Sequence, residues 1–339
     1  MTGRARDDPR SGARSGERQV ARLFVAFDSA LRRPLQFVLY FGHVSAIVDI
    51  ADRGNNHWST RHEHSSTGGG GAGRDGAAGW VSAHAAGKLE QVLARGKLVV
   101  GTGSTNAPWH FKGADGKLQG FDIDVAKMIA KALFDDPEKI EFVTQSSDAR
   151  IPNITTDKVD ITCQFLTVTG ARAQQVAFTI PYYREGVGLL LKSNSPYANY
   201  AALKAAGAKV KIAVLQNVYA EPMVHAALPA AKVSQFDSQD LIYQALNSGR
   251  ADAAATDQSS IDWFVKQNPG KYKDSGYGWN PQTYACAVKR GDQDWVNFVN
   301  TALHEAMTGV EFQTYAASFK TWFGADLAPP KIGFPIEYK

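Results

Sequence analysis

The sequence predicts an α/β protein with two units, each a mainly parallel sheet flanked by helices. Short apolar runs alternate with amphipathic stretches of helical spacing through residues 88–339, a pattern typical of strands joined by crossover helices. The alternation runs once to about Tyr183 and starts again near Lys209, which indicates the two units. Hydrophobic residues make up 44% of the 339 residues and charged residues 21%, which argues against a wholly disordered chain.

The individual elements follow from local spacing. Strands are expected where a short apolar run ends at a glycine or a polar residue: 97–101, 140–144, 159–163, 187–192, 209–215, 251–256 and 286–289. Helices are expected where apolar residues recur every three or four positions: 89–93, 125–133, 151–154, 220–227, 241–246 and 295–306. Asp115-Gly116 marks a hairpin turn.

Several classes of site are excluded by what the sequence lacks. A formal net charge of +4 is too small to predict a nucleic-acid binder. The sequence has no run of about 18 or more apolar residues, so we expect no transmembrane helix. Gly101-Thr102-Gly103 follows a strand, but position 106 is Asn106 and Pro108 stops the helix that would hold a pyrophosphate. With two cysteines and isolated histidines, we expect neither a cofactor nor a metal site.

Residues 1–87 differ from the rest, with 11 Arg, no Lys and a run of four glycines. Three interpretations stay open. Residues 31–40 faintly resemble a twin-arginine signal, and Ala83-His84-Ala85 has the pattern of a cleavage site, so the segment can be a targeting peptide. It can be a disordered extension. Finally, a misplaced start or a lost reading frame can leave only the end of a genuine signal in frame. His62-Glu63-His64 lacks zinc-protease spacing and is expected in a solvated loop.

Residues 120–125 read Gly-Phe-Asp-Ile-Asp-Val and open an amphipathic helix. Here the chain resembles the family 3 extracellular solute-binding proteins, which are the amino-acid receptors of ABC importers. The resemblance continues through 160–172, 176–183, 248–252 and 284–322 and covers roughly residues 88–326. It implies a two-lobed periplasmic-binding-protein fold (type II), in which two crossing segments form the hinge and ligand is held as the lobes close.

The resemblance also implies domain boundaries. Lobe 1 is expected to comprise residues 88–185 and 284–326, and lobe 2 residues 186–283. Residues 1–87 have no counterpart in the family, and residues 327–339 form a C-terminal tail.

The resemblance assigns the ligand carboxylate to lobe 1. Arg172 matches the family Arg that grips the α-carboxylate, and a guanidinium offers two parallel charge-assisted bonds to that planar group. Thr167 is expected to add its hydroxyl and backbone amide. The alternative for Arg172 is a surface Arg in the first turn of a helix.

The resemblance assigns the ligand ammonium to Asp257, which follows the motif Ser-Gly-Arg-Ala-Asp. A carboxylate at a lobe interface needs a cation, and the ligand supplies one. The backbone carbonyl of Phe165 is expected to share the ammonium. The alternative for Asp257 is a helix N-cap, and Asp252 is its rival if the register differs.

Lobe 2 is expected to add a helix N-terminus at 215–219, whose free amides can meet the ligand carboxylate. Asn217, Val218 and Tyr219 stand where family members usually carry Gly and hydroxyl residues. The hydroxyl contacts are therefore in doubt, and Tyr219 can reach toward the side-chain pocket instead.

Two positions where the family usually stacks an aromatic ring on the ligand carry Asn106 and Ser147. Trp109, Phe165 and Tyr219 are candidates to replace that contact, with lobe packing the alternative for Trp109.

Arg150 resembles the Arg of glutamate/aspartate receptors, although a further Arg of those receptors is missing near Gly103. We therefore expect a polar or acidic ligand. The alternative is that Arg150 faces solvent at a helix start. Glutamate/aspartate-type receptors also carry cysteines at the positions of Cys163 and Cys286, so the resemblance implies a disulfide in an oxidising compartment. Two buried free thiols are the alternative.

Taken together with these residues, the resemblance implies an exported, periplasmic, monomeric receptor that binds an amino acid, delivers it to an ABC permease and is not an enzyme. Two rivals stay open. One is a dehydratase on the same fold, similar to cyclohexadienyl dehydratase, for which Glu221 is the candidate acid. The other is a ligand-sensing module of a signalling protein.

Overall fold

The computed structural model describes residues 36–41, 44–49 and 86–333. Contacts divide the chain into residues 1–80 and 81–339, which are described separately. In the first unit, β1 (Gln36–Phe41) and β2 (Val44–Asp49) form an antiparallel hairpin. The apolar part of the predicted signal lies in β1, whereas the two arginines, the cleavage pattern and the His-Glu-His run lie outside the described residues.

One continuous sheet runs through the second unit, with the strand order β12-β11-β13-β10-β15-β8-β3-β7. Its strands are β3 (Leu98–Thr102), β7 (Ile140–Thr144), β8 (Ile161–Thr167), β10 (Tyr183–Lys192), β11 (Lys211–Leu215), β12 (Lys232–Phe236), β13 (Ala253–Asp257) and β15 (Trp279–Val288). Two short strands pair beside this path, β9 (Ala177–Phe178) with β15 and β14 (Tyr272–Asp274) with β10. A separate small sheet holds β4 (Thr105–Asn106), β5 (His110–Lys112) and β6 (Leu118–Gln119).

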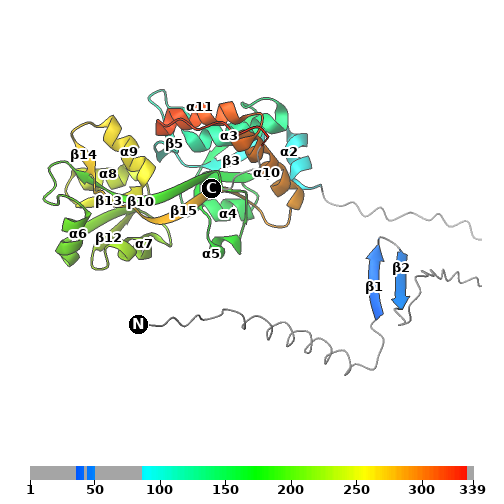
Figure 1. The fold of residues 1–339 in the computed structure, drawn as a ribbon, viewed down its shortest axis with the longest axis horizontal. Helices are drawn as coiled ribbons and strands as arrows, with labels where there is room; N and C mark the ends of the chain where they lie inside the picture. Colours follow the sequence, from blue (N-terminus) through cyan, green and yellow to red (C-terminus); the bar gives the residue numbers. More distant parts are fainter. Residues whose placement is uncertain (1–35, 42–43, 50–85, 334–339) are drawn as a thin grey trace, which may run out of the picture. The chain divides into compact units, whose positions relative to one another are not determined.

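The direction of pairing separates the two lobes from the connection between them. The outer ladders β3·β7, β3·β8, β11·β12 and β11·β13 are parallel, as predicted. The central strands β10 and β15 pair antiparallel with each other and with their outer neighbours. Figure 1 shows these two long strands running from one lobe into the other. The expectation of a parallel sheet therefore holds for the outer strands of each lobe, and the two crossing segments form an antiparallel ribbon.

Helices cover both faces of the sheet. Those of the first lobe are α2 (Lys88–Arg95), α3 (Phe121–Phe134), α4 (Arg150–Thr155), α5 (Gly170–Ala173), α10 (Gln293–Thr308) and α11 (Phe312–Phe323). Those of the second are α6 (Tyr200–Ala206), η1 (Gly207–Lys209), α7 (Ala220–Ala227), α8 (Gln239–Asn247) and α9 (Gln258–Gln267). In Figure 1, α3, α10 and α11 lie on the face opposite to α4 and α5. None of the helices in the described residues is long and apolar enough to cross a membrane.

Helix α3 begins four residues before its predicted start. Gly120, at φ 126°, turns the chain so that the amides of Phe121 and Asp122 donate to the carbonyls of Pro108 and Trp109. A Cβ atom at Gly120 would lie 2.3 Å from the Trp109 carbonyl oxygen, so only glycine is accommodated there. The Gly-Phe-Asp-Ile-Asp motif is therefore the first turn of the helix.

The hydrophobic core divides between the lobes. One cluster packs α2, α3, α10 and α11 around β3, β8 and β15. In the second lobe, alternate strand residues enter two clusters, with Leu189 and Leu191 on one face of the sheet and Leu190 on the other. Burial on both faces explains why these strands are apolar throughout rather than alternating. The lobe boundaries remain a proposal, which this division of the core supports.

The predicted disulfide between Cys163 and Cys286 is confirmed. It joins the neighbouring strands β8 and β15, with Cα atoms 4.4 Å apart, and both residues are fully buried.

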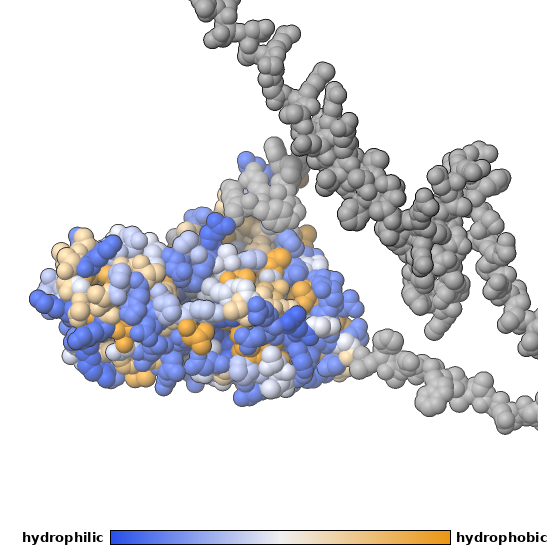
Figure 2. Space-filling model, turned by 90° about the horizontal axis from the view of Figure 1, so that it is seen from below, coloured by the Kyte–Doolittle hydropathy of each residue, from blue (hydrophilic) through white to orange (hydrophobic). Residues whose placement is uncertain are grey.

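The surface in Figure 2 is mostly hydrophilic, with hydrophobic residues scattered over it.

Candidate functional site

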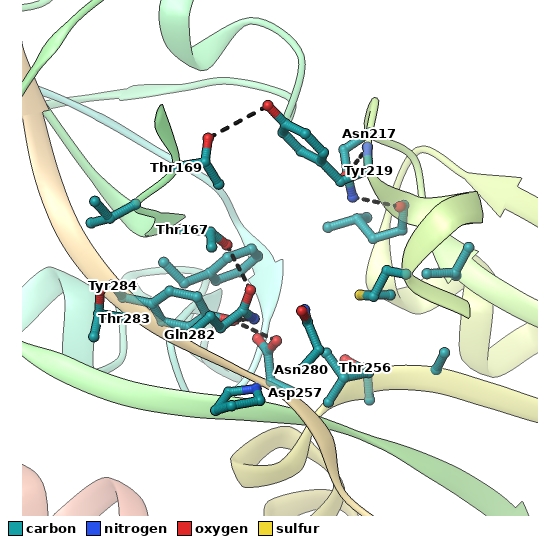
Figure 3. A pocket seen from close by; sticks show the side chains of 18 of the residues that line it. Thr167, Thr169, Asn217, Tyr219, Thr256, Asp257, Asn280, Gln282, Thr283 and Tyr284 are labelled. Atoms are coloured by element: carbon teal, nitrogen blue, oxygen red, sulfur yellow. Dashed lines mark hydrogen bonds between the residues drawn. The ribbon is translucent and has the colours of Figure 1, made fainter. Parts of the chain in front are cut away.

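A cavity of about 700 Å³ lies where loops of both lobes meet the crossing strands. Among the predicted site residues, seven line it: Arg150, Phe165, Thr167, Arg172, Asn217, Tyr219 and Asp257. Figure 3 shows side chains from both lobes converging on this space. The structure thus brings together residues that are up to 107 positions apart in the sequence.

Arg172 lies in the short helix α5 and is 8% exposed. Its Nη1 donates to the carbonyl of Thr167 at 2.9 Å, and the hydroxyl of Thr169, the helix N-cap, accepts from its backbone amide at 3.3 Å. Its guanidinium carbon lies 5.1 Å from the ring centre of Tyr219, which comes from the second lobe. Burial lowers the pKa of the guanidinium. Within the described residues it forms no ion pair with a carboxylate.

Asp257 ends β13 and occupies the N-cap position of α9, but its side chain makes no capping bond. Its Oδ1 instead accepts a 2.6 Å hydrogen bond from the Tyr284 hydroxyl. Asp257 therefore does not cap helix α9 with its carboxylate, which was the alternative role. Burial raises the pKa of the Asp257 carboxyl to about 6, and no basic side chain in the part of the chain described forms an ion pair with it. Asp252 accepts from the amide of Lys211 at the far end of β13 and does not line the cavity.

A hydrogen-bonded chain connects the two predicted ligand-binding ends. The hydroxyl of Thr167 donates to Oε1 of Gln282 at 3.1 Å, and Nε2 of Gln282 donates to the Tyr284 hydroxyl at 2.9 Å. Tyr284 then donates to Asp257 (Figure 3). Sequence reasoning missed Gln282 and Tyr284 as site residues. Their spacing of two along one strand, which places both side chains on one face, was the available signal.

Arg150 is buried rather than solvent-facing, at 3% exposure. Its Nε donates to the Ser147 carbonyl at 2.8 Å and its Nη1 to the Gln164 carbonyl at 3.0 Å, and its guanidinium lies 5.6 Å from the ring centre of Phe165. Burial lowers its pKa to about 10, and the positive charge of Arg172 is the second cause. Two guanidinium groups that repel each other therefore adjoin one cavity.

Phe165 is held in a left-handed conformation, with φ 33°. Its amide donates to Oδ2 of Asp122 at 2.9 Å, and its ring stacks on His110 at 4.5 Å between centres. Asp122 also accepts from the hydroxyl of Tyr182 at 2.6 Å. The first acid of the Gly-Phe-Asp motif thus fixes the strand that carries the binding residues.

The helix N-terminus of the second lobe differs from the expectation. The amide of Gln216 donates to Phe236, that of Asn217 to the side chain of Gln235, and that of Tyr219 to Oδ1 of Asn217. These three amides have partners within the chain: strand β12 supplies them for Gln216 and Asn217, and the Asn217 side chain, folded back over the turn, supplies one for Tyr219. The side chain of Asn217 also donates to the Leu215 carbonyl.

Two predicted residues lie away from the cavity lining. Trp109 is 0% exposed, and its ring packs among aromatic rings of the first lobe. Its Nε1 donates to Ser259 Oγ, so the lobe-packing alternative describes it and ligand stacking does not. Val218 is 80% exposed. Glu221, the candidate acid of an enzyme, is also exposed and outside the lining.

A second cavity of about 280 Å³ adjoins the first, and Asn106 and Leu215 line both. Its other lining residues are small or polar and include Ser147, Gln164 and Asp237. The two positions that lack the expected aromatic rings therefore open into polar space. No group of three or more potential metal ligands occurs among the described residues.

Comparison with known proteins identifies the family. Residues 98–325 match the bacterial extracellular solute-binding proteins, family 3. The histidine-binding periplasmic protein of Salmonella typhimurium is 32% identical over 238 residues, which cover 68% of this chain and 89% of that protein. The ABC transporter glutamine-binding protein of Bacillus subtilis is 28% identical over 215 residues, covering 63% and 76%.

Solved structures agree with this match. An ancestral amino acid-binding protein, a precursor of cyclohexadienyl dehydratase, superposes with a TM-score of 0.61 at 32% identity and covers 70% of this chain and 100% of its own. These comparisons agree with the motif at 120–125, the two-lobed sheet and the interlobe cavity. The chain belongs to the family 3 bacterial extracellular solute-binding proteins.

Proposed function

We infer that the chain binds a free L-amino acid between its lobes. The observation that carries this proposal is a pair of opposite charges, Arg172 and Asp257, which line one cavity and have no ion-pair partner among the described residues. A charge removed from water is costly unless it is paired. A zwitterion supplies both missing partners, with its carboxylate at Arg172 and Thr167 and its ammonium at Asp257.

The side chain of the ligand is proposed to be polar or acidic. Arg150 adds a second guanidinium near the carboxylate end, and the adjoining cavity is lined mainly by hydroxyl and amide groups, with one carboxylate, that of Asp237. Glutamate and glutamine satisfy both features. The relatives named above are a histidine-binding and a glutamine-binding protein, which supports a polar ligand.

The partner is proposed to be the permease of an ABC importer, and the compartment the periplasm. Relatives with these attributes support the proposal, as does a disulfide, which persists in an oxidising compartment. We propose that the receptor works as a monomer. Its relatives are binding proteins rather than enzymes, and this chain is a binding protein and not an enzyme.

A thermal-shift screen of the twenty amino acids and common opines, followed by calorimetry of the best ligand, tests the proposal. Binding is expected in the wild type. Arg172→Ala should weaken it well over tenfold, because the ligand carboxylate would then be buried without a partner. Arg250→Ala, at an exposed arginine, is the matched control. Equal affinity of the wild type and Arg172→Ala would refute the assignment.

A further inference from the structure

The hinge strand β10 carries a buried carboxyl group that takes no part in the proposed grip. Glu185 is 7% exposed. Its Oε2 accepts a 2.5 Å hydrogen bond from Ser259 Oγ, and its Oε1 accepts one of 2.9 Å from the amide of Gly186. Ser259 in turn accepts from Trp109 Nε1 at 3.1 Å. All these partners are neutral, and no basic side chain among the described residues forms an ion pair with Glu185.

Asp257 lies near Glu185, at the end of the neighbouring strand. Strands β10 and β13 are antiparallel with Val187 opposite Asp257, so Glu185 falls beside the residues that open α9. Burial raises the pKa of the Glu185 carboxyl to about 8, and the negative charge of Asp257 is the second cause. Burial also raises the pKa of Asp257. Two buried acids on neighbouring strands whose charges repel each other do not ionise independently, because the first charge opposes the second.

The other charges around the pair do not remove this competition. The positive charge of Arg150 lowers the pKa of Asp257, but the opposite effect of Asp122 is larger. The hydrogen bond from Tyr284 favours the ionised Asp257, and those from Ser259 and Gly186 favour the ionised Glu185, but burial outweighs them in both carboxyl groups. The titratable groups around the pair come from β10, β15, α3, α4 and α8: Tyr183, Tyr284, Asp122, Arg150 and Tyr243, with Arg184 next to Glu185 in the sequence.

We propose that Glu185 and Asp257 share one proton in the empty protein, and that the ammonium group of a bound amino acid takes the place of that proton. The second half rests on the proposed function. Glu185 lies outside the cavity lining and acts through Asp257, so it is a positioning residue that sets the charge available to the ligand.

The proton balance is simple. The empty pair consists of one carboxylic acid and one carboxylate. When the ammonium arrives beside Asp257, both carboxyl groups ionise, one proton leaves to solvent, and no covalent bond of the ligand changes. Binding is therefore proton-linked, and affinity falls by up to about tenfold for each pH unit below the apparent pKa of the pair.

The first experiment uses the ligand-free full chain. Carboxyl groups labelled with ¹³C are titrated by NMR in the wild type, in Glu185→Gln and in Glu305→Gln, a control at an exposed helix position. The wild type and the control should each show a carboxyl group that titrates near pH 8, and Glu185→Gln should lose it while the titration of Asp257 near pH 6 remains. If every carboxyl group of the wild type titrates below about pH 7, the shared proton does not exist.

The second experiment counts protons during binding. L-glutamine and L-glutamate are titrated calorimetrically at about pH 5.5 and about pH 7 in two buffers of different ionisation enthalpy. At about pH 7 the wild type and Glu185→Asp should release close to one proton per bound amino acid and Glu185→Gln almost none, whereas at about pH 5.5 Glu185→Gln should release only the proton of Asp257. A purely structural role would change affinity by the same factor at both pH values and leave the proton count unchanged.

The two proposals fail in different ways. Amino-acid binding without any proton release, or with equal release in Glu185→Gln, overturns the proton exchange and leaves the proposed function standing. A titrating pair in a protein that binds none of the twenty amino acids supports the shared proton and overturns the proposed function.

Discussion

The hydroxyl group of Tyr284 donates a 2.6 Å hydrogen bond to Oδ1 of Asp257. Tyr284 lies on β15 and Asp257 at the end of β13, and these strands are not adjacent, because β10 lies between them in the sheet. Both side chains line the cavity, and Gln282 links Tyr284 onward to Thr167. The proposed ammonium and carboxylate sites are therefore connected through hydrogen bonds of one crossing strand.

Removal of this hydroxyl should weaken ligand binding. Tyr284→Phe leaves the ring in place but deprives Asp257 of the hydrogen bond that lowers its pKa. A hydrogen bond to a charged group contributes about 1.5–3 kcal/mol, so an affinity loss of about tenfold or more is expected by calorimetry at neutral pH. Tyr277→Phe, at an exposed tyrosine, should bind like the wild type. Unchanged affinity in Tyr284→Phe would show that this bond does not serve the site.

The ring of Tyr219 should contribute more than its hydroxyl. The ring lies 5.1 Å from the guanidinium carbon of Arg172, whereas the hydroxyl makes only a 3.4 Å contact with Thr169 Oγ1. A cation–π contact contributes about 0.5–2 kcal/mol. Tyr219→Leu is therefore expected to bind the screened amino acid roughly two- to thirtyfold more weakly, and Tyr219→Phe to stay close to the wild type. Equal losses in both variants would assign the effect to the hydroxyl instead.

Loss of the disulfide should lower stability more than binding. The pair joins residues 123 positions apart, and closing so long a loop restricts the unfolded chain. The double variant Cys163→Ala/Cys286→Ala should lose about 3–5 kcal/mol of unfolding free energy in urea titrations. Neither cysteine lines the cavity, so ligand affinity at low denaturant should stay within a few-fold. Two reactive thiols in the oxidised wild type would contradict the pairing.

The acid pair should make the empty protein less stable as pH rises. The folded-state pKa of Glu185 is raised from 4.5 to about 8 and that of Asp257 from 3.8 to about 6, so the folded chain binds these protons more tightly than the unfolded chain. Their contribution to stability is present at about pH 4 and is lost as pH rises through about 8.

Thermal unfolding measures this effect. The melting temperature of Glu185→Gln minus that of the wild type should increase from pH 5 to about pH 8, because the variant lacks the buried charge that forms in the wild type. Asp257→Asn should show the same trend at lower pH. A constant difference across the range would mean that Glu185 titrates as it does in the unfolded chain.

Local sequence signals predicted most helices and strands, but they could not predict which strands distant in the sequence pair with each other. The helix at 220–227 and the hairpin turn at Asp115-Gly116 follow from spacing and turn chemistry, and the structure has both. Helix α3 starts earlier than its apolar stripe because Gly120 sets a turn that depends on the carbonyl of Trp109. Such a contact is not visible in the spacing of residues along one helix.

Seven of the nine proposed ligand-binding residues line the cavity, and the exceptions have physical reasons. Trp109 follows the first strand, as an aromatic ligand contact would, but five neighbouring rings enclose it. Gln282 and Glu185 escaped notice because their importance depends on the register between β15, β10 and β13. Where the residues on the adjoining strands are also polar, the hydrophobic pattern of a single sequence does not fix which residues face each other across the sheet.

The pairing of β10 with β15 has a mechanical consequence. Two independent linkers would let the halves of the molecule swing and twist in many directions. A two-stranded ribbon held by backbone hydrogen bonds flexes most easily about an axis within its own plane, because sliding one strand along the other would break its ladder. The two lobes should therefore close along one path, and each closure should bring Arg172 and Asp257 back to the same relative position.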